Sequence, residues 1–235
     1  MRTILISGAN RGIGLNIAHR ELKAGNRISI GIRDLESIKG SVIDPNNWRK
    51  DKILINKYDA LDKLSAEKWI KNTISNFGGF DSLINCSGIL SKIPFLYKDG
   101  DEKEILNTLN INFLAIWNLC RLSWEHLSKS NNGRIIVLVS MSGKRSKGDL
   151  AAYSASKFAL MSLCQTIKNK GWEENIRVTA ICPGWVNTDM AEKISSLEKS
   201  KMTQPNDIAE ICSTILKLPM QSVPFEIALN CNHEI

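Results

Sequence analysis

Tyr153 and Lys157 are the residues of this 235-residue sequence whose types and spacing most directly suggest acid–base chemistry. Four positions apart on a helix, they share one face, with the lysine ammonium beside the tyrosine phenol. A phenol has an ordinary pKa of about 10, which matches proton transfer at neutral pH poorly. A lysine cation, together with any second cation in the same cleft, would lower that pKa by stabilising the phenolate. The alternative is an ordinary pair on a solvated helix surface.

The sequence around this pair favours a catalytic site. Ser140 ends an apolar run that is predicted to be a strand, thirteen residues before Tyr153. The face that carries Tyr153 and Lys157 continues through apolar residues at Leu160, Cys164 and Ile167. A charged side chain on the face of a helix that packs into the core indicates a specific role, because charged side chains are seldom buried without one. We therefore expect Ser140, Tyr153 and Lys157 to form a catalytic group.

Short apolar runs alternate with longer amphipathic windows along the whole chain. The predicted strands span residues 3–6, 27–32, 52–55, 82–84, 134–139, 176–181 and 225–229. The predicted helices span residues 13–25, 62–77, 101–128, 151–170 and 204–217. This alternation predicts an α/β fold with a doubly wound, mostly parallel sheet of Rossmann type and helices on both faces. We expect one domain over residues 1–235, with a cofactor half near 1–130 and a catalytic and substrate half near 131–235.

A glycine-rich turn follows the first predicted strand. Gly8, Gly12 and Gly14 enclose Arg11 and Ile13 in a G-x3-G-x-G spacing. Glycines at this place allow a tight turn and let backbone N–H groups approach a pyrophosphate at a helix N-terminus. Plain turn chemistry is the alternative, but the first βα turn of a doubly wound sheet favours a nucleotide site.

The residue after the second strand indicates which dinucleotide binds. An acidic residue in this place accepts hydrogen bonds from the ribose of NAD, but here Ile32 is followed by Arg33. Arg33 and Arg11 could pair with the 2′-phosphate of NADP, while Asp34 is expected to begin the next helix. We therefore expect NADP rather than NAD, with a solvated loop charge as the alternative for Arg33.

Four further polar or small residues stand where a ligand or a structural contact would need them. Asp59 could accept from an adenine amino group or cap the next helix. Asn85 and Gly88 follow the fourth strand, where a ribose could lie against the backbone. Thr188 could cap a helix or bond a carboxamide or phosphate. Each of these alternatives is left open by the sequence.

The window 101–128 is apolar on two faces. One face comprises Ile105, Leu109, Phe113, Ile116, Leu119 and Cys120. Asn112 lies in the middle of this face, and a buried amide needs hydrogen-bond partners, so Asn112 is either a structural staple or part of a polar network. The other face carries Ile111, Leu114, Trp117 and Leu122. A helix that is apolar on two sides is buried twice, which predicts subunit packing.

Composition narrows the classes of partner. The formal net charge is +7, and the sequence pI is about 9.1, which favours anionic ligands. The basic residues are scattered rather than clustered, so we expect no nucleic acid partner. No apolar stretch is long enough for a membrane span or a signal peptide, so we expect a soluble cytoplasmic protein. Six cysteines and three histidines lack metal-site spacing, and we expect no metal.

Taken in order, these motifs resemble those of the short-chain dehydrogenase/reductase family over essentially the whole chain. The resemblance implies that Tyr153 is the acid and base, that Lys157 lowers its pKa and holds the nicotinamide ribose, and that Ser140 bonds the substrate oxygen. It also implies that Asn112 anchors a water that connects Lys157 to solvent. The cofactor site would comprise Gly8, Arg11, Gly12, Ile13, Gly14, Arg33, Asp59, Asn85, Gly88, Tyr153, Lys157 and Thr188.

The resemblance implies an NADP-dependent oxidoreductase for a carbonyl or alcohol substrate. Met141, Trp185 and Met190 follow the relevant strands, so the substrate is expected to be partly apolar. Cys86-Ser87 stands where the family usually has Asn-Ala, and the segment 226–235 lacks the usual close. We therefore expect a homodimer through the helices near 101–128 and 151–170, with a tetramer possible. A non-catalytic NADP-binding sensor or interaction protein is the alternative; neither substrate identity nor reaction direction follows from these residues.

Overall fold

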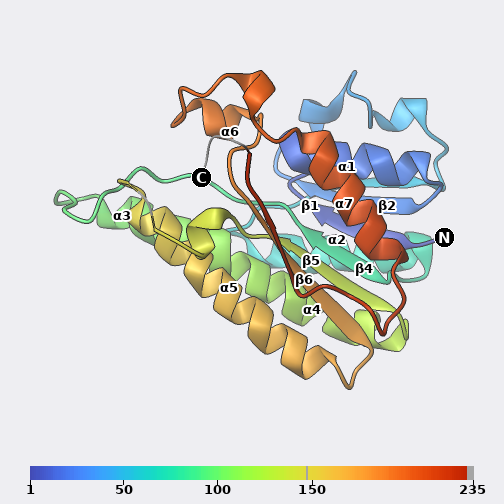
Figure 1. Cartoon of the computed structure of the whole chain (residues 1–235). Helices are drawn as coiled ribbons and strands as arrows, with labels where there is room; N and C mark the ends of the chain where they lie inside the picture. The colour runs from blue at the N-terminus through green and yellow to red at the C-terminus, as the bar shows by residue number, and fades with distance from the viewer. Residues whose placement is uncertain (147, 232–235) are drawn as a thin grey trace.

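A seven-stranded sheet in the order β3-β2-β1-β4-β5-β6-β7 lies at the centre of the computed structural model, which describes residues 1–146 and 148–231 (Figure 1). Every pair of neighbouring strands is parallel. The strands are β1 (Thr3–Ser7), β2 (Arg27–Ile32), β3 (Ile53–Lys57), β4 (Ser82–Asn85), β5 (Gly133–Leu138), β6 (Ile176–Pro183) and β7 (Glu226–Leu229). The predicted fold class is therefore confirmed, and each predicted strand overlaps an observed one.

Helices cover both faces of the sheet and give it two hydrophobic cores. They are α1 (Gly12–Lys23), α2 (Lys63–Phe77), α3 (Glu102–Leu109), α4 (Ala115–Lys129), α5 (Ala151–Gly171), α6 (Asp189–Glu192) and α7 (Pro205–Lys217). Trp69 of α2, Leu119 of α4 and Leu160 of α5 pack in one core. Ile17 of α1 and Ile208 of α7 pack in the other. The strands between the two edge strands are buried on both faces, which explains why their sequences are apolar without alternation.

The predicted helix over 101–128 is interrupted by a wider turn. Between α3 and α4, residues Asn110–Leu114 form a π-helical turn. An extra residue per turn rotates the positions around it, and Ile111, expected on the outer face, is buried. Leu114 and Trp117 do lie outside, about half exposed. The prediction of one uninterrupted helix was wrong because a regular 3.6-residue period cannot reveal an inserted residue.

Four arginines at the beginnings of strands bind carbonyl groups at the ends of helices. Arg2, just before β1, donates to the Leu216 carbonyl at 2.8 Å, and Arg134 in β5 donates to the Leu218 carbonyl at 2.6 Å. Arg27 in β2 and Arg177 in β6 do the same at α2 and α5, through the carbonyls of Phe77 and Trp172. Helix C-termini carry partial negative charge and unpaired carbonyls. Part of the basic excess in this sequence therefore stabilises the fold instead of attracting a partner.

The described part of the chain contains no helix long and apolar enough to cross a bilayer. None of the six cysteines forms a disulfide with another described residue; five are buried and Cys86 is half-buried. Buried cysteines of this kind act as small apolar residues of the core.

Candidate active site

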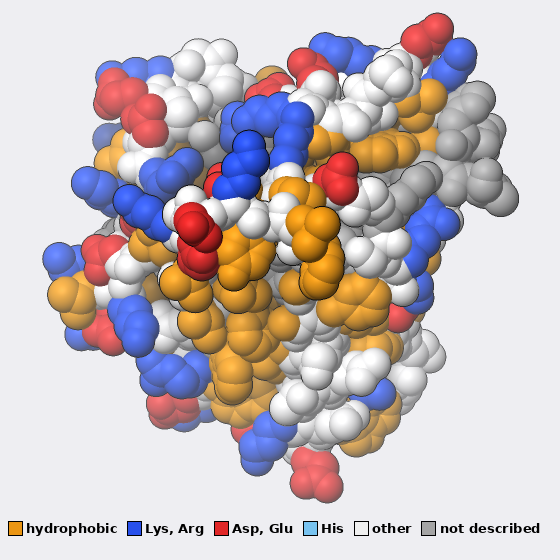
Figure 2. All heavy atoms as spheres, turned by 90° about the vertical axis from the view of Figure 1, so that its left-hand side faces the viewer, with side chains coloured by type: hydrophobic (Ala, Val, Ile, Leu, Met, Phe, Trp, Pro, Cys, Tyr) orange, Lys and Arg blue, Asp and Glu red, His pale blue; other side chains and the backbone are white. Residues whose placement is uncertain are grey.

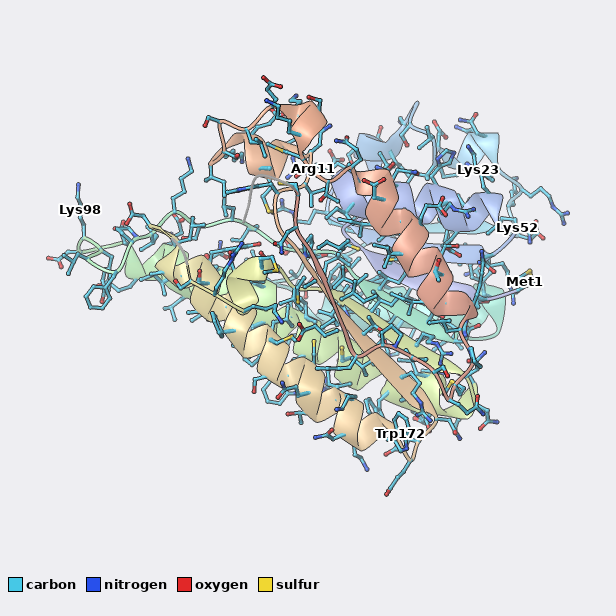
Figure 3. All side chains as sticks on the ribbon, in the orientation of Figure 1. Met1, Arg11, Lys23, Lys52, Lys98 and Trp172 are labelled. Carbon is cyan, nitrogen blue, oxygen red and sulfur yellow. The ribbon has the colours of Figure 1, made fainter. Side chains whose placement is uncertain are left out.

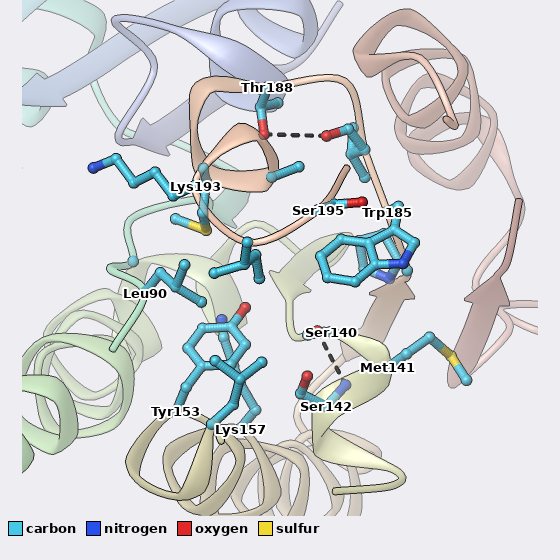
Figure 4. A pocket seen from close by; sticks show the side chains of 18 of the residues that line it. Leu90, Ser140, Met141, Ser142, Tyr153, Lys157, Trp185, Thr188, Lys193 and Ser195 are labelled. Carbon is cyan, nitrogen blue, oxygen red and sulfur yellow. Dashed lines mark hydrogen bonds between the residues drawn. The ribbon is translucent and has the colours of Figure 1, made fainter. Parts of the chain in front are cut away.

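A cleft of about 880 Å³ lies where the strands end. Its walls come from the segments that follow β4, β5 and β6, together with the first turns of α5. In Figure 4, Tyr153 and Lys157 rise from α5, Ser140 lies beside them, and the segment with Thr188 and Lys193 covers the other side. Ligands of parallel α/β sheets bind at this edge, so the cleft is the candidate active site.

The predicted site residues divide into two groups. Six of them line the cleft, namely Ile13, Gly88, Ser140, Tyr153, Lys157 and Thr188. The others are outside its lining, and they are Gly8, Arg11, Gly12, Gly14, Arg33, Asp59, Asn85 and Asn112. Most of this second group belongs to the ends of β1, β2 and β3 or to the turn after β1. Most of the predicted catalytic residues therefore line the cleft, and most of the predicted cofactor residues lie at the neighbouring strand ends.

Tyr153 and Lys157 lie together on the buried side of α5. The two residues are 8% and 4% exposed, and the face continues through the buried Leu160, Cys164 and Ile167. The Lys157 Nζ lies 5.7 Å from the centroid of the Tyr153 ring and donates a hydrogen bond of 3.0 Å to the Leu138 carbonyl at the end of β5. The sheet thus fixes the ammonium, and the interpretation as a surface pair is excluded.

Burial changes the acidity of both groups. Desolvation lowers the pKa of Lys157 from 10.5 to about 8. Burial also raises the pKa of Tyr153, and hydrogen bonding with Ser140 acts in the opposite direction. The phenol of the protein alone is therefore a weaker acid than free tyrosine, and the lowered pKa expected with an oxidised nicotinamide beside it stays a prediction.

Ser140 is held beside the phenol by the turn that follows β5. Its Oγ accepts a hydrogen bond of 3.0 Å from the backbone N–H of Ser142, at the start of a 3₁₀ turn over Met141–Gly143. Gly143 presses this turn against α5, because a Cβ there would lie 2.7 Å from the Lys157 carbonyl oxygen. The Ser142 N–H occupies one acceptor position of the Ser140 oxygen, and the Ser140 hydroxyl is within hydrogen-bonding reach of the Tyr153 phenol.

Asn112 joins the π turn to the segment after β4. Its Oδ1 accepts from the Ile89 N–H at 2.8 Å, and its Nδ2 donates to the Ile89 carbonyl at 2.9 Å and to Ser156 at 3.1 Å. Of the two alternatives from the sequence, the staple is confirmed. A Cβ on Gly88 would lie 3.3 Å from the Asn112 Oδ1 and 3.8 Å from the Lys157 Nζ, so both atoms border the open side of this glycine.

The glycine turn has the properties of a pyrophosphate cradle. Gly8 and Gly12 adopt positive φ angles of 69° and 54°, and a Cβ on Gly12 would lie 3.3 Å from a Thr188 methyl group. No side chain of the described residues caps the first turn of α1, and that turn contains no acidic residue. Free amides, the positive end of a helix dipole and the absence of carboxylates suit an anion. The turn therefore fits a dinucleotide pyrophosphate.

Arg33 and Asp34 follow β2, and Asp59 follows β3. Ile32 is buried, Arg33 is exposed, and Arg33 makes no ion pair or hydrogen bond with any described residue. Asp34 accepts from the Glu36 N–H at 3.0 Å and so begins a short helix, as predicted. Asp59 does not cap α2, because Asp62 does; its Oδ1 accepts instead from the Leu61 N–H at 2.9 Å.

The glycine turn contacts the start of α6 through Arg11 and Gly12. Arg11 forms an ion pair of 3.2 Å with Asp189, the first residue of α6, and Figure 3 shows Arg11 where that segment meets α1. Thr188 directly precedes α6, but its hydroxyl accepts no hydrogen bond from a backbone N–H of that helix and instead donates to the Val186 carbonyl at 3.3 Å. The capping role is therefore not found for Thr188.

Asn85 and Cys86 lie on different sides of β4. Asn85 is completely buried, and its amide donates to the Cys120 sulfur at 3.7 Å. Cofactor contact at this point must therefore come from the backbone, as the sequence suggested, and it stays a prediction. Cys86 lines the cleft, where burial raises the pKa of its thiol to about 12. That thiol remains protonated and is not a nucleophile at neutral pH.

The cleft also contains residues that the sequence did not reveal. Met141, Trp185 and Met190, expected near the substrate, do line it. Leu90, Lys92, Arg145, Lys193 and Ile194 line it as well. They lie in irregular segments, several residues beyond the strand ends, where neither periodicity nor a motif marks them.

Comparisons with known proteins agree on the kind of protein this chain resembles. A family model described as short chain dehydrogenase matches residues 2–199. Agropine synthesis reductase of Rhizobium rhizogenes is 32% identical over 216 residues, covering 92% of this chain and 49% of that protein. This chain thus spans about half of the length of that relative.

Two solved structures share the fold over nearly their full lengths. An alcohol dehydrogenase from the archaeon Thermococcus sibiricus, complexed with 5-hydroxy-NADP, has a TM-score of 0.86 and 22% identity, covering 100% of this chain and 98% of that one. Actinorhodin polyketide ketoreductase with NADPH has a TM-score of 0.85 and 23% identity, covering 97% and 95%. At these identities, the likeness establishes the architecture that surrounds the cleft.

Proposed function

The chain belongs to the short-chain dehydrogenase family of oxidoreductases, and from this premise we propose that it transfers a hydride between NADP and a carbonyl or alcohol carbon. One observation carries the proposal: Tyr153, Lys157 and Ser140 meet at the buried end of a cleft beyond the strands. The substrate is a small molecule, and Tyr153 is its general acid and base.

The cofactor, when bound, supplies or accepts the hydride at its nicotinamide ring. Gly8, Gly12 and Gly14 would hold its pyrophosphate on the N-terminus of α1. Thr188 would contact it from the opposite wall, because its hydroxyl is not used as a helix cap. Lys157 would bind the nicotinamide ribose through its ammonium group, which already lies beside Gly88.

Tyr153 moves the proton. Because burial raises the pKa of its phenol, Tyr153 is protonated at neutral pH and can donate to the oxygen of a carbonyl during reduction. Ser140, which lies beside the phenol, would turn its hydroxyl hydrogen to the same oxygen when the carbonyl is bound, while its own oxygen accepts from the Ser142 N–H. In the oxidation direction, Tyr153 must first lose its proton, which the Lys157 ammonium assists by stabilising the phenolate.

Lys157 and Asn112 would return the proton to solvent. The Asn112 Oδ1 accepts one hydrogen bond, from Ile89, and retains capacity for another donor. That oxygen and the Lys157 Nζ border the same open side of Gly88. A water between them would connect the buried ammonium to Asn112, which is the role that we propose for this asparagine in addition to its staple.

The strand ends support a preference for NADP. Arg33 is exposed, has no partner among the described residues, and follows β2, where NAD-binding proteins have an acidic residue. Ile32 offers no acceptor for ribose hydroxyls. An arginine guanidinium binds a phosphate dianion through two parallel hydrogen bonds, so Arg33 suits the 2′-phosphate. Arg11 would join it after release from Asp189.

Exposed apolar side chains on three helices and on the π turn support a homodimer. Leu106 of α3, Trp117 of α4 and Phe158 of α5 are 59%, 49% and 46% exposed, and Leu114 in the π turn is 48% exposed. Large apolar side chains grouped in this way mark interaction sites. A second copy of the chain is the proposed partner, in agreement with the expectation from the sequence.

The direct test is turnover with a panel of aldehydes and ketones. The purified chain is mixed with NADPH or NADH, and consumption of the reduced nicotinamide is followed by absorbance. We expect carbonyl-dependent oxidation that is faster with NADPH at low cofactor concentration. Tight binding of NADPH with no turnover of any carbonyl or alcohol would instead indicate the non-catalytic NADP-binding protein.

A further inference from the structure

The mouth of the catalytic cleft carries more positive than negative charge. Three cationic residues line it, Lys92 after β4, Arg145 after β5 and Lys193 after α6, and the acidic residues in its lining are Asp149 and Glu192. The catalytic mechanism proposed above uses none of them. Three separate segments of the chain thus each place a cationic residue at the same cleft, and this excess of positive charge indicates a role in binding.

The negative charges do not balance this excess. Glu192 is already neutralised by Lys199, whose Nζ lies 2.5 Å from its Oε1. Lys92 and Lys193 are exposed, and neither forms an ion pair with any residue that the structure describes. Their ammonium groups therefore remain available to an incoming anion.

Apolar residues separate these lysines from the catalytic group. Leu90, Met141, Trp185, Met190 and Ile194 line the same cleft and are half-buried, whereas the lysines are exposed and Tyr153 is buried. In Figure 4, Lys193 extends above Leu90 on one side, while Trp185 and Met141 lie on the other. Figure 2, which looks onto this side of the molecule, shows Lys and Arg side chains gathered above a broad hydrophobic area. The arrangement has a polar catalytic end, an apolar middle and a cationic rim.

We propose that the substrate carries an anionic group, a carboxylate or a phosphate, which Lys92 and Lys193 bind at the mouth of the cleft. An apolar segment of the substrate fills the space beside Trp185 and Leu90 and places the reacting carbonyl at Tyr153. This inference rests on the proposed oxidoreductase function and names its substrate class: an oxo acid or an oxo phosphate ester with an apolar spacer.

The size of the effect follows from the exposure of the two lysines. An ion pair at an exposed site changes affinity by about two- to five-fold, so two lysines together give roughly ten-fold. The attraction is weakened by salt, because exposed charges are screened within about 10 Å at 0.1 M ionic strength. The expected preference is therefore moderate and depends on salt, unlike the recognition of a buried anion.

The experiment compares matched substrates in matched variants. Oxo acids of increasing chain length are assayed against their methyl esters with NADPH, and oxo phosphate esters form a second arm that distinguishes the two anions. The variants are Lys92→Gln, Lys193→Gln and their combination. Lys98→Gln is the control, because Lys98 is an exposed lysine on a loop outside the cleft lining, as Figure 3 shows.

We expect an anionic substrate to have a KM about ten-fold lower than its methyl ester in the unmodified protein and in Lys98→Gln. The double variant should reduce this ratio to about two or less, mainly through KM rather than kcat, and high salt should do the same. An equal KM for acids and esters, or a preference that survives in the double variant, overturns the inference while leaving the oxidoreductase function intact.

A binding measurement keeps the test independent of turnover. Saturated carboxylates that lack the carbonyl, and their amides, are titrated by calorimetry into the protein with NADPH present. Tighter binding of the carboxylate that is lost in the double variant supports the inference even when no oxo acid is reduced, in which case the proposed function fails alone. Equal binding of carboxylate and amide overturns the inference.

Discussion

Arg11 and Asp189, which are 178 positions apart in the sequence, form an ion pair of 3.2 Å between the glycine turn and the first residue of α6. Both side chains are about two-thirds exposed. The contact ties the segment that covers the cleft to the turn where the cofactor is proposed to bind. Arg11 is also one of the two arginines proposed for the 2′-phosphate, so Asp189 competes with the cofactor for it.

Asp189→Asn is therefore expected to tighten the binding of NADPH. The exposed ion pair contributes less than about 1 kcal/mol, so releasing Arg11 should lower the Kd of NADPH by about two- to three-fold and leave that of NADH nearly unchanged. Fluorescence titration measures both constants. Glu210→Gln, which removes an ion pair with Arg20 far from the cleft, is the control. An unchanged or weaker affinity of Asp189→Asn for NADPH would contradict the competition.

Arg33→Ala is expected to weaken NADPH far more than NADH. Loss of a charge-assisted hydrogen bond costs about 1.5–3 kcal/mol, which is about ten-fold or more in the Kd of NADPH. The same titration serves for this variant. Arg49→Ala is a matched control, because Arg49 is exposed but already paired with Asp51 at 2.9 Å. If Arg33→Ala leaves the ratio of the two Kd values unchanged, the 2′-phosphate is bound elsewhere.

Lys157→Met is expected to stabilise the fold at neutral pH while abolishing turnover. Burial lowers the pKa of Lys157 from 10.5 to about 8, so the folded state disfavours its cation. Below pH 8 the folded protein bears the full cost of burying the lysine cation. The free energy of unfolding of Lys157→Met should therefore be higher than that of the unmodified protein by up to about 3 kcal/mol. Above pH 8 the folded lysine loses its proton while the unfolded chain keeps it, so the difference should shrink.

Urea unfolding of both proteins at pH 7, 8 and 9 measures this difference. The comparison between variants matters, because the thiols titrate near pH 9 in the unfolded chain while burial raises their pKa in the fold, and this contribution cancels between the two proteins. A difference that stays constant or grows from pH 8 to pH 9 would mean that Lys157 is not held at a lowered pKa.

Trp117→Glu is expected to dissociate the proposed homodimer. Trp117 and Phe158 are both about half exposed on neighbouring helices, and a carboxylate placed between two copies of this face would be desolvated without a partner. Sedimentation at micromolar concentration should show a dimer for the unmodified chain and a monomer for the variant. The control is Val42→Glu, because Val42 is as exposed as Trp117 but lies outside the helices of the proposed interface; this variant should remain dimeric. A monomer before mutation would refute the dimer.

Regular elements could be predicted from the sequence because their signals are local. The strands appear as short apolar runs that are buried on both faces, and β2 was predicted with its observed bounds at 27–32. The pairing of Tyr153 with Lys157 follows from a single helix period. Ser140 could be added because strand ends of a parallel sheet meet at one edge.

Contacts that depend on distant or irregular segments could not be predicted. The π turn at Asn110–Leu114 has no marker in the hydrophobic pattern, although it positions Asn112 against Ile89. The contact of Arg11 with Asp189 joins residues from opposite ends of the chain. The lysines at the mouth of the cleft lie in loops, whose course depends on packing rather than on periodicity. The raised pKa of Tyr153 likewise depends on burial that only the fold supplies.

Tyr153→Phe tests the central claim most directly, because it removes the hydroxyl and keeps the ring that packs in the cleft. The account predicts that kcat for any carbonyl substrate falls by about 10²–10⁴-fold, while the Kd of NADPH changes by less than about three-fold. Absorbance at the nicotinamide band measures turnover, and fluorescence titration measures binding. Retention of kcat, or a parallel loss of turnover and cofactor affinity, would contradict the assignment of Tyr153 as the general acid and base.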